Sequence, residues 1–231
     1  MEKEIEKVTA ILPSAGSGRR MGKDIPKQFL KIQNKPIFIY TLEKLDSSTL
    51  INEIILVVRT EDVNAVKETV EEWGIRKVSS VVPGGKERQD SVLNGLKILS
   101  EEVNIVVIHD AVRPFVSVEK IEEVIKVARE KEAAILAIPV KDTIKRGGDG
   151  CVEATLNRNF LWSVQTPQAF KTDLIKKAFE KARQDGIYAT DDSSLVERLG
   201  YPVYIVEGEE QNIKITSPED LLIAEVFVDN Y

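Results

Sequence analysis

Short runs of β-branched and aliphatic residues alternate along this chain with amphipathic stretches, and this alternation restricts the fold more than any other feature. It is typical of a mostly parallel sheet covered by helices. Because the runs are almost continuously apolar, we expect strands that are buried on both faces. The predicted strands are Val8–Leu12, Glu53–Arg59, Val78–Val82, Ile105–His109, Ala133–Val140 and Val203–Val206.

Between these runs, apolar residues recur at helical spacing. The predicted helices are Asp62–Trp73, Arg88–Ser100 and Val118–Glu130. Near the C-terminus, Ser217 and Pro218 followed by two acids predict a further helix start, because these residues favour a cap, a first turn and the positive end of the helix dipole. The sequence therefore predicts an α/β protein: a Rossmann-like, mostly parallel sheet with helices on both faces, in one domain over residues 1–231.

One segment, Asp142–Thr166, interrupts the alternation. Within it, Gly147–Gly150 is typical of a hairpin turn. A hairpin inserted directly after a core strand has no obvious place in the sheet, so we expect a β-hairpin arm that protrudes from the body. Such arms commonly serve dimerisation, and a homodimer formed through residues 142–166 is therefore expected.

The composition excludes several classes of protein. A net charge of −6 argues against non-specific binding to nucleic acid or to a membrane surface. No apolar run approaches the ~18 residues of a membrane span, and Met1–Lys7 mixes acids and bases, unlike a signal peptide. A single cysteine, Cys151, fits the reducing cytoplasm. The lone histidine, His109, disfavours Ser-His-Asp catalysis and histidine-rich metal sites.

A glycine-rich, basic loop, Pro13–Lys27, follows the first predicted strand. Glycines let a backbone approach phosphate oxygens and turn its N–H groups toward them. The loop lies where open α/β sheets bind ligands, which favours a site for a nucleoside triphosphate. The glycines are Gly16, Gly18 and Gly22, and the basic residues in and after the loop are Arg19, Arg20, Lys23, Lys27, Lys31 and Lys35, against the single acid Asp24.

Two better-known phosphate loops do not fit this spacing. The dinucleotide fingerprint G-x-G-x-x-G has Met21 at its third glycine position, one residue too early for Gly22. A P-loop would need Ser or Thr where this chain has Asp24.

Six separated motifs resemble those of the 2-C-methyl-D-erythritol 4-phosphate cytidylyltransferases, a nucleotidyltransferase family of the non-mevalonate isoprenoid pathway. The resemblance covers essentially the whole chain from Val8 onward. It implies a reaction that joins CTP to a sugar-alcohol phosphate, 2-C-methyl-D-erythritol 4-phosphate, and releases pyrophosphate with the help of Mg²⁺. The motifs are P-S-A-G-S-G-R-R-M-G with P-K-Q-F-L, G-G-K-E-R-Q-D-S-V, H-D-A-V-R-P, P-V-K-D-T-I-K-R, R-N-F-L-W with T-P-Q-A-F, and N-I-K-I-T-S-P-E-D.

The resemblance also implies roles for individual residues. Arg20 and Lys27 would stabilise the transition state at the α-phosphate, with Mg²⁺ bridging triphosphate oxygens. Lys214 would hold the attacking phosphate, and Arg158 would position it from the arm of a partner subunit. A phosphate monoester is already mostly dianionic at pH 7, so this nucleophile needs no general base.

Further residues are implied around the two substrates. Asp110, at the end of a strand, is expected to contact substrate or to bind the metal, whereas His109 beside it is expected to be a packed strand-end residue. Residues Pro13–Gly16 and Gly84–Ser91 would frame cytosine. The expected nucleotide-binding residues are Pro13, Ser14, Ala15, Gly16, Gly18, Gly85, Lys86 and Ser91, and the expected acceptor-binding residues are Asp110, Arg113, Thr143, Thr166 and Thr190.

Two alternatives stay open. Ribitol-5-phosphate cytidylyltransferases share the glycine loop, H-D-A-V-R-P-F and T-P-Q, although D-T-I-K-R and R-N-F-L-W favour the methylerythritol branch. A non-catalytic nucleotide-binding module is the alternative from another class. The presence of Arg20, Lys27 and Lys214 argues against it, because a degenerate module is expected to lose its cations.

Overall fold

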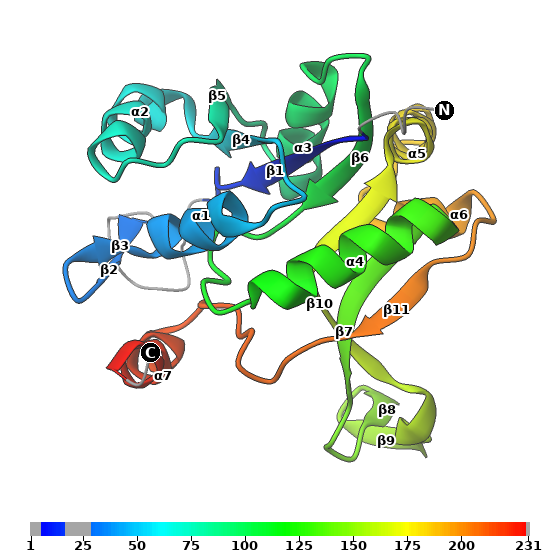
Figure 1. The fold of residues 1–231 in the computed structure, drawn as a ribbon. Coiled ribbons are helices and arrows are strands. Elements are labelled where there is room, and N and C mark those ends of the chain that lie inside the picture. Colours follow the sequence, from blue (N-terminus) through cyan, green and yellow to red (C-terminus); the bar gives the residue numbers. More distant parts are fainter. Residues whose placement is uncertain (1–5, 17–28, 230–231) are drawn as a thin grey trace.

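The computed structural model describes residues 6–16 and 29–229, which form an α/β fold around a central sheet (Figure 1). Within these residues the sheet has seven strands in the order β11-β7-β10-β6-β1-β4-β5. β1 pairs in parallel with both β4 and β6, whereas β10 runs antiparallel to β6 and β7. The predicted fold class, a mostly parallel sheet covered by helices, is confirmed.

The predicted strands are all present, with small shifts at their ends. They are β1 (Lys7–Pro13), β4 (Glu53–Val58), β5 (Val78–Pro83), β6 (Val103–Ile108), β7 (Ala133–Pro139) and β11 (Tyr204–Glu207). The edge strands β5 and β11 are only partly buried, so the expectation of burial on both faces holds for the inner strands. The sequence analysis missed β10 (Trp162–Lys171) and the short pair β2 (Lys31–Ile32) and β3 (Lys35–Pro36).

The predicted helices are confirmed as α2 (Val63–Glu72), α3 (Arg88–Lys97), α4 (Val118–Lys131) and α7 (Pro218–Asp229). The predicted start of α2 is instead a short 3-10 turn, Thr60–Asp62. Ser217 caps α7 as expected, because its hydroxyl accepts from the N–H of Asp220 at 3.3 Å. The structure adds α1 (Ile37–Ser47), α5 (Thr172–Gln184) and α6 (Ser193–Arg198), and no helix in the described part of the chain is long and apolar enough to cross a membrane.

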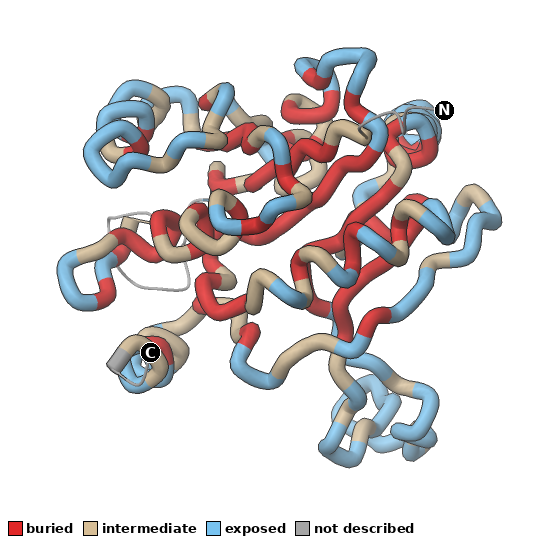
Figure 2. The backbone as a smooth tube through the Cα atoms, viewed as in Figure 1, coloured by how far each residue is buried: buried red, intermediate tan, exposed pale blue. Residues whose placement is uncertain are grey.

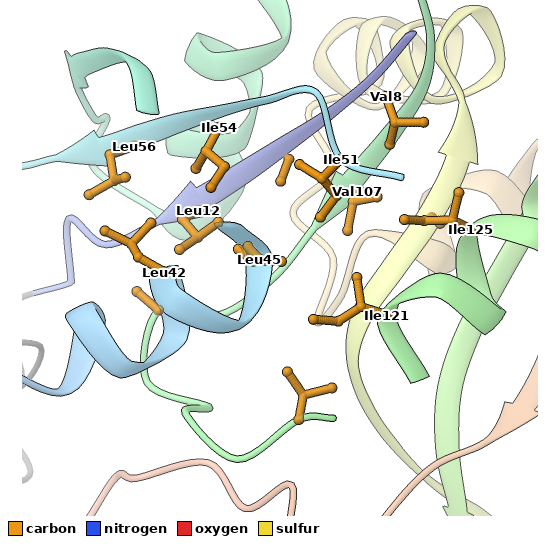
Figure 3. Close-up of a cluster of buried hydrophobic side chains, with 14 of the residues drawn as sticks. Val8, Leu12, Leu42, Leu45, Ile51, Ile54, Leu56, Val107, Ile121 and Ile125 are labelled. Carbon is orange, nitrogen blue, oxygen red and sulfur yellow. The ribbon is translucent and has the colours of Figure 1, made fainter. Parts of the chain in front are cut away.

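The core consists of two layers, one on each face of the sheet, because successive strand residues point to opposite faces. On β1, Val8, Ala10 and Leu12 face the layer formed with α1, α2 and α4. Ile11 faces the other layer, beneath α3, α5 and α6. Figure 3 shows Leu12 between Leu42 and Leu45 of α1 and the neighbouring strands. Figure 2 shows that burial is concentrated along the sheet and on the helix faces that pack against it. A third, smaller apolar cluster lies beneath α7.

The predicted hairpin is present as β8 (Lys145–Gly148) and β9 (Cys151–Thr155), which project from the ends of β7 and β10 (Figure 1). Its turn residues, Asp149 and Gly150, have φ values of 51° and 78°, as a type I′ hairpin turn requires. The projecting part is shorter than the predicted segment 142–166, because the chain returns into the sheet as β10 and Thr166 is buried there.

Candidate active site

A pocket opens at the carboxyl ends of β1, β5 and β6. From β1 the chain continues to β4 on one side of it and to β6 on the other, so the strand order reverses here. Open α/β sheets bind ligands at such a point. Its lining comes from four segments that are far apart in the sequence. In the described part of the chain these residues are Pro13, Ser14, Ala15, Gly16, Gly85, Lys86, Glu87, Arg88, Ser91, Asp110, Ala111, Val112 and Lys214.

The loops after β1 and β5 form one side of the pocket and touch each other. Both are tied to β4: the N–H of Ser14 donates to the carbonyl oxygen of Val57, and the N–H of Gly84 to that of Val58, each at 2.7 Å. A Cβ atom on Gly84 would lie 2.5 Å from the Cβ of Ala15. Glycine at 84 is therefore needed for the close approach of the two loops that were expected to frame the base.

The turn before α3 is organised by its own side chains. Glu87 and Asp90 form a reciprocal capping box at the start of the helix. The Ser91 hydroxyl accepts from the N–H of Gly85 at 3.2 Å and donates to the carbonyl oxygen of Glu87 at 3.2 Å. Ser91, expected to lie near the edge of the base, lines the pocket and also holds the shape of this turn.

Asp110, directly after β6, is the centre of the charge arrangement. Its Oδ1 accepts from Arg88 Nε at 3.0 Å, and Lys214 Nζ and Arg113 Nε lie 2.6 Å and 3.9 Å from its Oδ2. Burial alone would raise the pKa of this carboxyl, but Arg88, Lys214 and Arg113 together lower it far below its usual range. Asp110 is therefore ionised at any physiological pH and cannot serve as a general acid.

Arg88, which the sequence analysis did not single out, bridges two buried carboxylates. Besides Asp110 it contacts Asp192, with 2.8 Å between its NH2 and Asp192 Oδ2. Burial would lower the pKa of Arg88, but the two carboxylates raise it well above its usual range. For Asp192, burial is the larger effect and raises the pKa despite the contact with Arg88. Arg88 is part of the motif G-G-K-E-R-Q-D-S-V, yet its partners follow only from the fold.

His109 is fully buried and has a defined tautomer. Its Nε2 lies 3.1 Å from the carbonyl oxygen of Arg113, which can only accept, so Nε2 carries the hydrogen. Nδ1 then accepts from the Thr166 hydroxyl at 2.9 Å, and that hydroxyl accepts from the N–H of Asp110 at 3.0 Å. Burial lowers the pKa of His109 to about 4, so the ring is neutral at pH 7. This geometry supports the expected packing role and leaves no nitrogen for proton transfer in the pocket.

The segment before α7 is hydrogen-bonded to the loop that follows β6, and this fixes the position of Lys214. The N–H of Ile215 donates to the carbonyl oxygen of Val112 at 2.9 Å. Arg113 NH1 donates to the carbonyl oxygen of Asn212 at 2.7 Å. Asn212, which is completely buried, donates from Nδ2 to the carbonyl oxygen of Thr166 at 2.9 Å. Arg113 and Thr166 thus support the pocket from behind Asp110.

Other expected site residues lie elsewhere in this single chain. Thr143 and Arg158 are exposed in the arm region and outside the pocket lining, and Arg158 NH1 donates to the carbonyl oxygen of Lys141 at 2.6 Å. Thr190 is exposed in the connection between α5 and α6. Lys35, one of the basic cluster, is paired with Glu43 at 2.7 Å. Gly18, Arg20 and Lys27 lie outside the described residues.

Comparison with known proteins gives one consistent result. The family model for 2-C-methyl-D-erythritol 4-phosphate cytidylyltransferase matches residues 8–230. The chain is 49% identical over 224 residues to the enzyme of that name from Syntrophus aciditrophicus, covering 96% of each chain. It is 48% identical over 226 residues to the one from Pelotomaculum thermopropionicum, covering 97% of this chain and 95% of that one. Among solved structures, 4-diphosphocytidyl-2C-methyl-D-erythritol synthase from Anaerococcus prevotii superposes with a TM-score of 0.87 at 34% identity, covering 98% of this chain and 97% of that one.

Proposed function

Because this chain belongs to the 2-C-methyl-D-erythritol 4-phosphate cytidylyltransferase family, we propose how its own residues carry out that reaction. The enzyme joins CTP to 2-C-methyl-D-erythritol 4-phosphate, giving 4-diphosphocytidyl-2-C-methyl-D-erythritol and pyrophosphate in the non-mevalonate pathway. A phosphate oxygen of the acceptor attacks the α-phosphorus of CTP. The bond from that phosphorus to the oxygen bridging to the β-phosphorus breaks, and pyrophosphate leaves.

The observation that supports the assignment of roles is the cationic cluster around Asp110. Arg88, Arg113 and Lys214 surround one carboxylate, so the pocket carries positive charge in a chain whose net charge is −6. Two anionic substrates must be brought together here, and cations that are fixed in advance reduce their repulsion and the charge that develops at phosphorus. Lys214 lines the pocket and is proposed to contact the attacking phosphate. Arg20 and Lys27 are proposed to act at the α-phosphate.

No general base is needed in this mechanism. The acceptor phosphate has a second pKa of about 6 and is mostly dianionic at pH 7. The side chains near the reacting groups agree with this. His109 is neutral and bonded on both ring nitrogens, and Asp110 is held as a carboxylate by its cations. The protein contributes position and charge, and the substrate supplies its own nucleophile.

The base is proposed to bind between Pro13–Gly16 and the turn Gly84–Ser91. Backbone N–H and C=O groups of these loops can read the edge of a pyrimidine. The contact between Gly84 and Ala15 narrows the space and so disfavours a larger purine. Lys86, also on the pocket wall, is available to a phosphate or ribose oxygen.

Magnesium is proposed as the metal that accompanies CTP. Among the described residues there is no group of three or more His, Cys, Asp and Glu side chains that could hold an ion by themselves. A pocket with a single carboxylate ligand still fits Mg²⁺, because this ion commonly takes one or two carboxylates together with substrate phosphates and water. Asp110 lines the pocket and would be that ligand, with the metal taking the place of one of its present contacts with Arg88 or Lys214. Once bound, the metal would neutralise charge on the triphosphate.

A homodimer formed through the arm is also proposed. The arm strands β8 and β9 are almost entirely exposed (Figure 2), and an isolated two-stranded hairpin is only marginally stable in water. Large apolar side chains are exposed on the arm and the adjoining end of β10, with Phe160 at 80%, Val152 at 65% and Val164 at 42%. Burial of these side chains against a second copy would bring Arg158 and Thr143 toward the partner's acceptor site.

Sedimentation analysis tests the dimer. Phe160→Asp is expected to yield monomers and to reduce activity, whereas Ile98→Asp, at an exposed apolar position at the end of α3, serves as the matched control. A Phe160→Asp protein that stayed dimeric would show that the arm is not the interface.

Pyrophosphate release tests the acceptor. The protein is incubated with CTP, Mg²⁺ and either 2-C-methyl-D-erythritol 4-phosphate or ribitol 5-phosphate, and release is expected with the first. Release with ribitol phosphate alone would exclude the acceptor assignment, and CTP binding without turnover would favour a non-catalytic module.

Lys214→Ala is expected to lower kcat/KM at least a hundredfold, the size of effect seen when a transition-state charge contact is lost.

A further inference from the structure

The first turn of α3 holds the segment Ile187–Asp192, which connects α5 to α6. Gln89 donates from its Nε2 to the carbonyl oxygen of Ile187 at 2.9 Å, and its Oε1 accepts from the N–H of Ala189 at 2.9 Å. One side-chain amide thus bonds the carbonyl of one residue and the N–H of the residue two positions later, the same pattern that a residue of a neighbouring parallel strand makes. The path of this segment is fixed relative to α3.

The residues on either side of Gln89 contact the same segment. Arg88 contacts Asp192 at 2.8 Å, and Asp90 accepts from the Tyr188 hydroxyl at 3.2 Å. Three consecutive residues of α3 therefore contact the segment along its length. We name this set of contacts, from residues 88–90 to residues 187–192, the α3 clasp.

The opposite side of the same turn faces the nucleotide pocket. Gly85, Lys86 and Arg88 line that pocket, whereas Gln89 is not among the residues that line it in the described part of the chain. Gln89 instead lines an adjoining depression with Tyr188 and Ala189, and Lys86, Glu87 and Arg88 line both the pocket and this depression. The turn thus has two faces: one toward the proposed cytosine site and one toward the clasped segment.

Thr190 lies in the middle of the clasped segment. On one side, Ala189 is held by Gln89. On the other, the Asp191 carboxylate accepts from Gln168 Nε2 at 2.9 Å and from the N–H of Ser194 at 3.2 Å. Thr190 is thus exposed, while its two neighbours are anchored to different parts of the fold.

We propose that Gln89 is a positioning residue for the acceptor: by holding Ile187 and Ala189, it places Thr190 relative to the turn that binds the nucleotide. This inference rests on the proposed function and on the role that the family resemblance implies for Thr190, which is contact with the sugar-alcohol phosphate. Since Gln89 does not line the nucleotide pocket, its loss affects binding of the acceptor and leaves binding of CTP intact.

Steady-state kinetics of Gln89→Ala tests the proposal. With CTP saturating, the KM for 2-C-methyl-D-erythritol 4-phosphate is expected to rise about tenfold, the scale of losing one or two hydrogen bonds. The KM for CTP is expected to stay within about twofold of the parent. Gln184→Ala, at an exposed glutamine at the end of α5, is the matched control and is expected to change neither value. Hydrogen exchange at the Ala189 amide is expected to become faster in Gln89→Ala alone.

A Thr190→Ala variant separates the possible failures. If Thr190→Ala raises the acceptor KM and Gln89→Ala does not, the clasp proposal is wrong and the proposed acceptor site stands. If neither variant changes the acceptor KM, the acceptor role of Thr190 is wrong, and the inference about Gln89 fails with it. If Gln89→Ala raises both KM values together and lowers the thermal midpoint of unfolding, Gln89 is a structural residue and the proposal is overturned.

Discussion

Acidification from pH 7.5 to pH 5.0 is expected to destabilise this protein mainly through one residue, His109. Burial lowers the pKa of the folded-state imidazole from 6.5 to about 4. Between these values the unfolded chain binds a proton that the folded chain does not, so the free energy of unfolding falls as the pH falls. Above the unfolded pKa of about 6.5 the stabilisation is fully present.

The size of the effect follows from the difference between the two pKa values. The full difference corresponds to about 3 kcal/mol, since one pKa unit is about 1.4 kcal/mol. At pH 5.0 roughly 2 kcal/mol of this is expected to be lost. The residue is fully buried, so solvent screening does not reduce the figure. His109 is also the only histidine of the chain, so no other imidazole titrates between pH 5.5 and pH 7.

Urea unfolding measured across this range, at one fixed protein concentration, checks the prediction. The parent should lose stability steadily below pH 6.5. His109→Gln cannot titrate in this range, and it should be less stable at pH 7.5 but much flatter with pH. Equal slopes for the parent and His109→Gln would refute the reasoning, because the pH dependence would then come from other groups.

Three further substitutions test the pocket and the ion pairs beside it. Gly84→Ala should raise the KM for CTP and cost about 1–3 kcal/mol of stability, because its Cβ would lie 2.5 Å from that of Ala15. Gly148→Ala in the arm is the control, since an added Cβ there meets only one side-chain oxygen, at 3.7 Å. Equal effects of the two substitutions would contradict the steric argument. Arg88→Met should destabilise the fold by about 3–5 kcal/mol, because it leaves the buried Asp192 carboxylate unpaired and removes one of the cations around Asp110. Asp192→Asn should cost much less, since burial already raises the pKa of Asp192; a larger loss for Asp192→Asn in urea unfolding would reverse this assignment.

The strand and helix pattern predicted most of the sheet, and its omissions have identifiable causes. α5 was missed although Leu174, Ala178 and Ala182 show clear helical spacing, so its signal was present in the sequence. β10 was hidden because Pro167 argues against an inner strand. The structure accommodates that proline at an irregularity in the pairing of β10 with β7, between Val164 and Gln168.

The residues of the candidate site were only partly predictable, because some of their contacts join segments that are far apart in the sequence. The loop after β1 and Asp110 were indicated by their places at the ends of strands that meet at one edge of the sheet, whereas Lys214 was indicated by the family resemblance alone. No motif could show that Arg88 reaches both Asp110 and Asp192, since that bridge joins segments brought together only by folding. The roles of Arg20, Lys27, Thr143 and Arg158 stay predictions.

The distance along the chain between Pro13 and Lys214, which line the same pocket, has a consequence for biosynthesis. Chains grow from the N-terminus, and early segments can fold while later ones are still being made. The strands β1, β4, β5 and β6 can assemble early, and they already carry the loops that are proposed to bind the base. Lys214 arrives only after β11, so a nascent chain or a fragment ending before it lacks the proposed phosphate-binding lysine. The proposed phosphate-binding lysine is therefore present only in chains that have been made past residue 214.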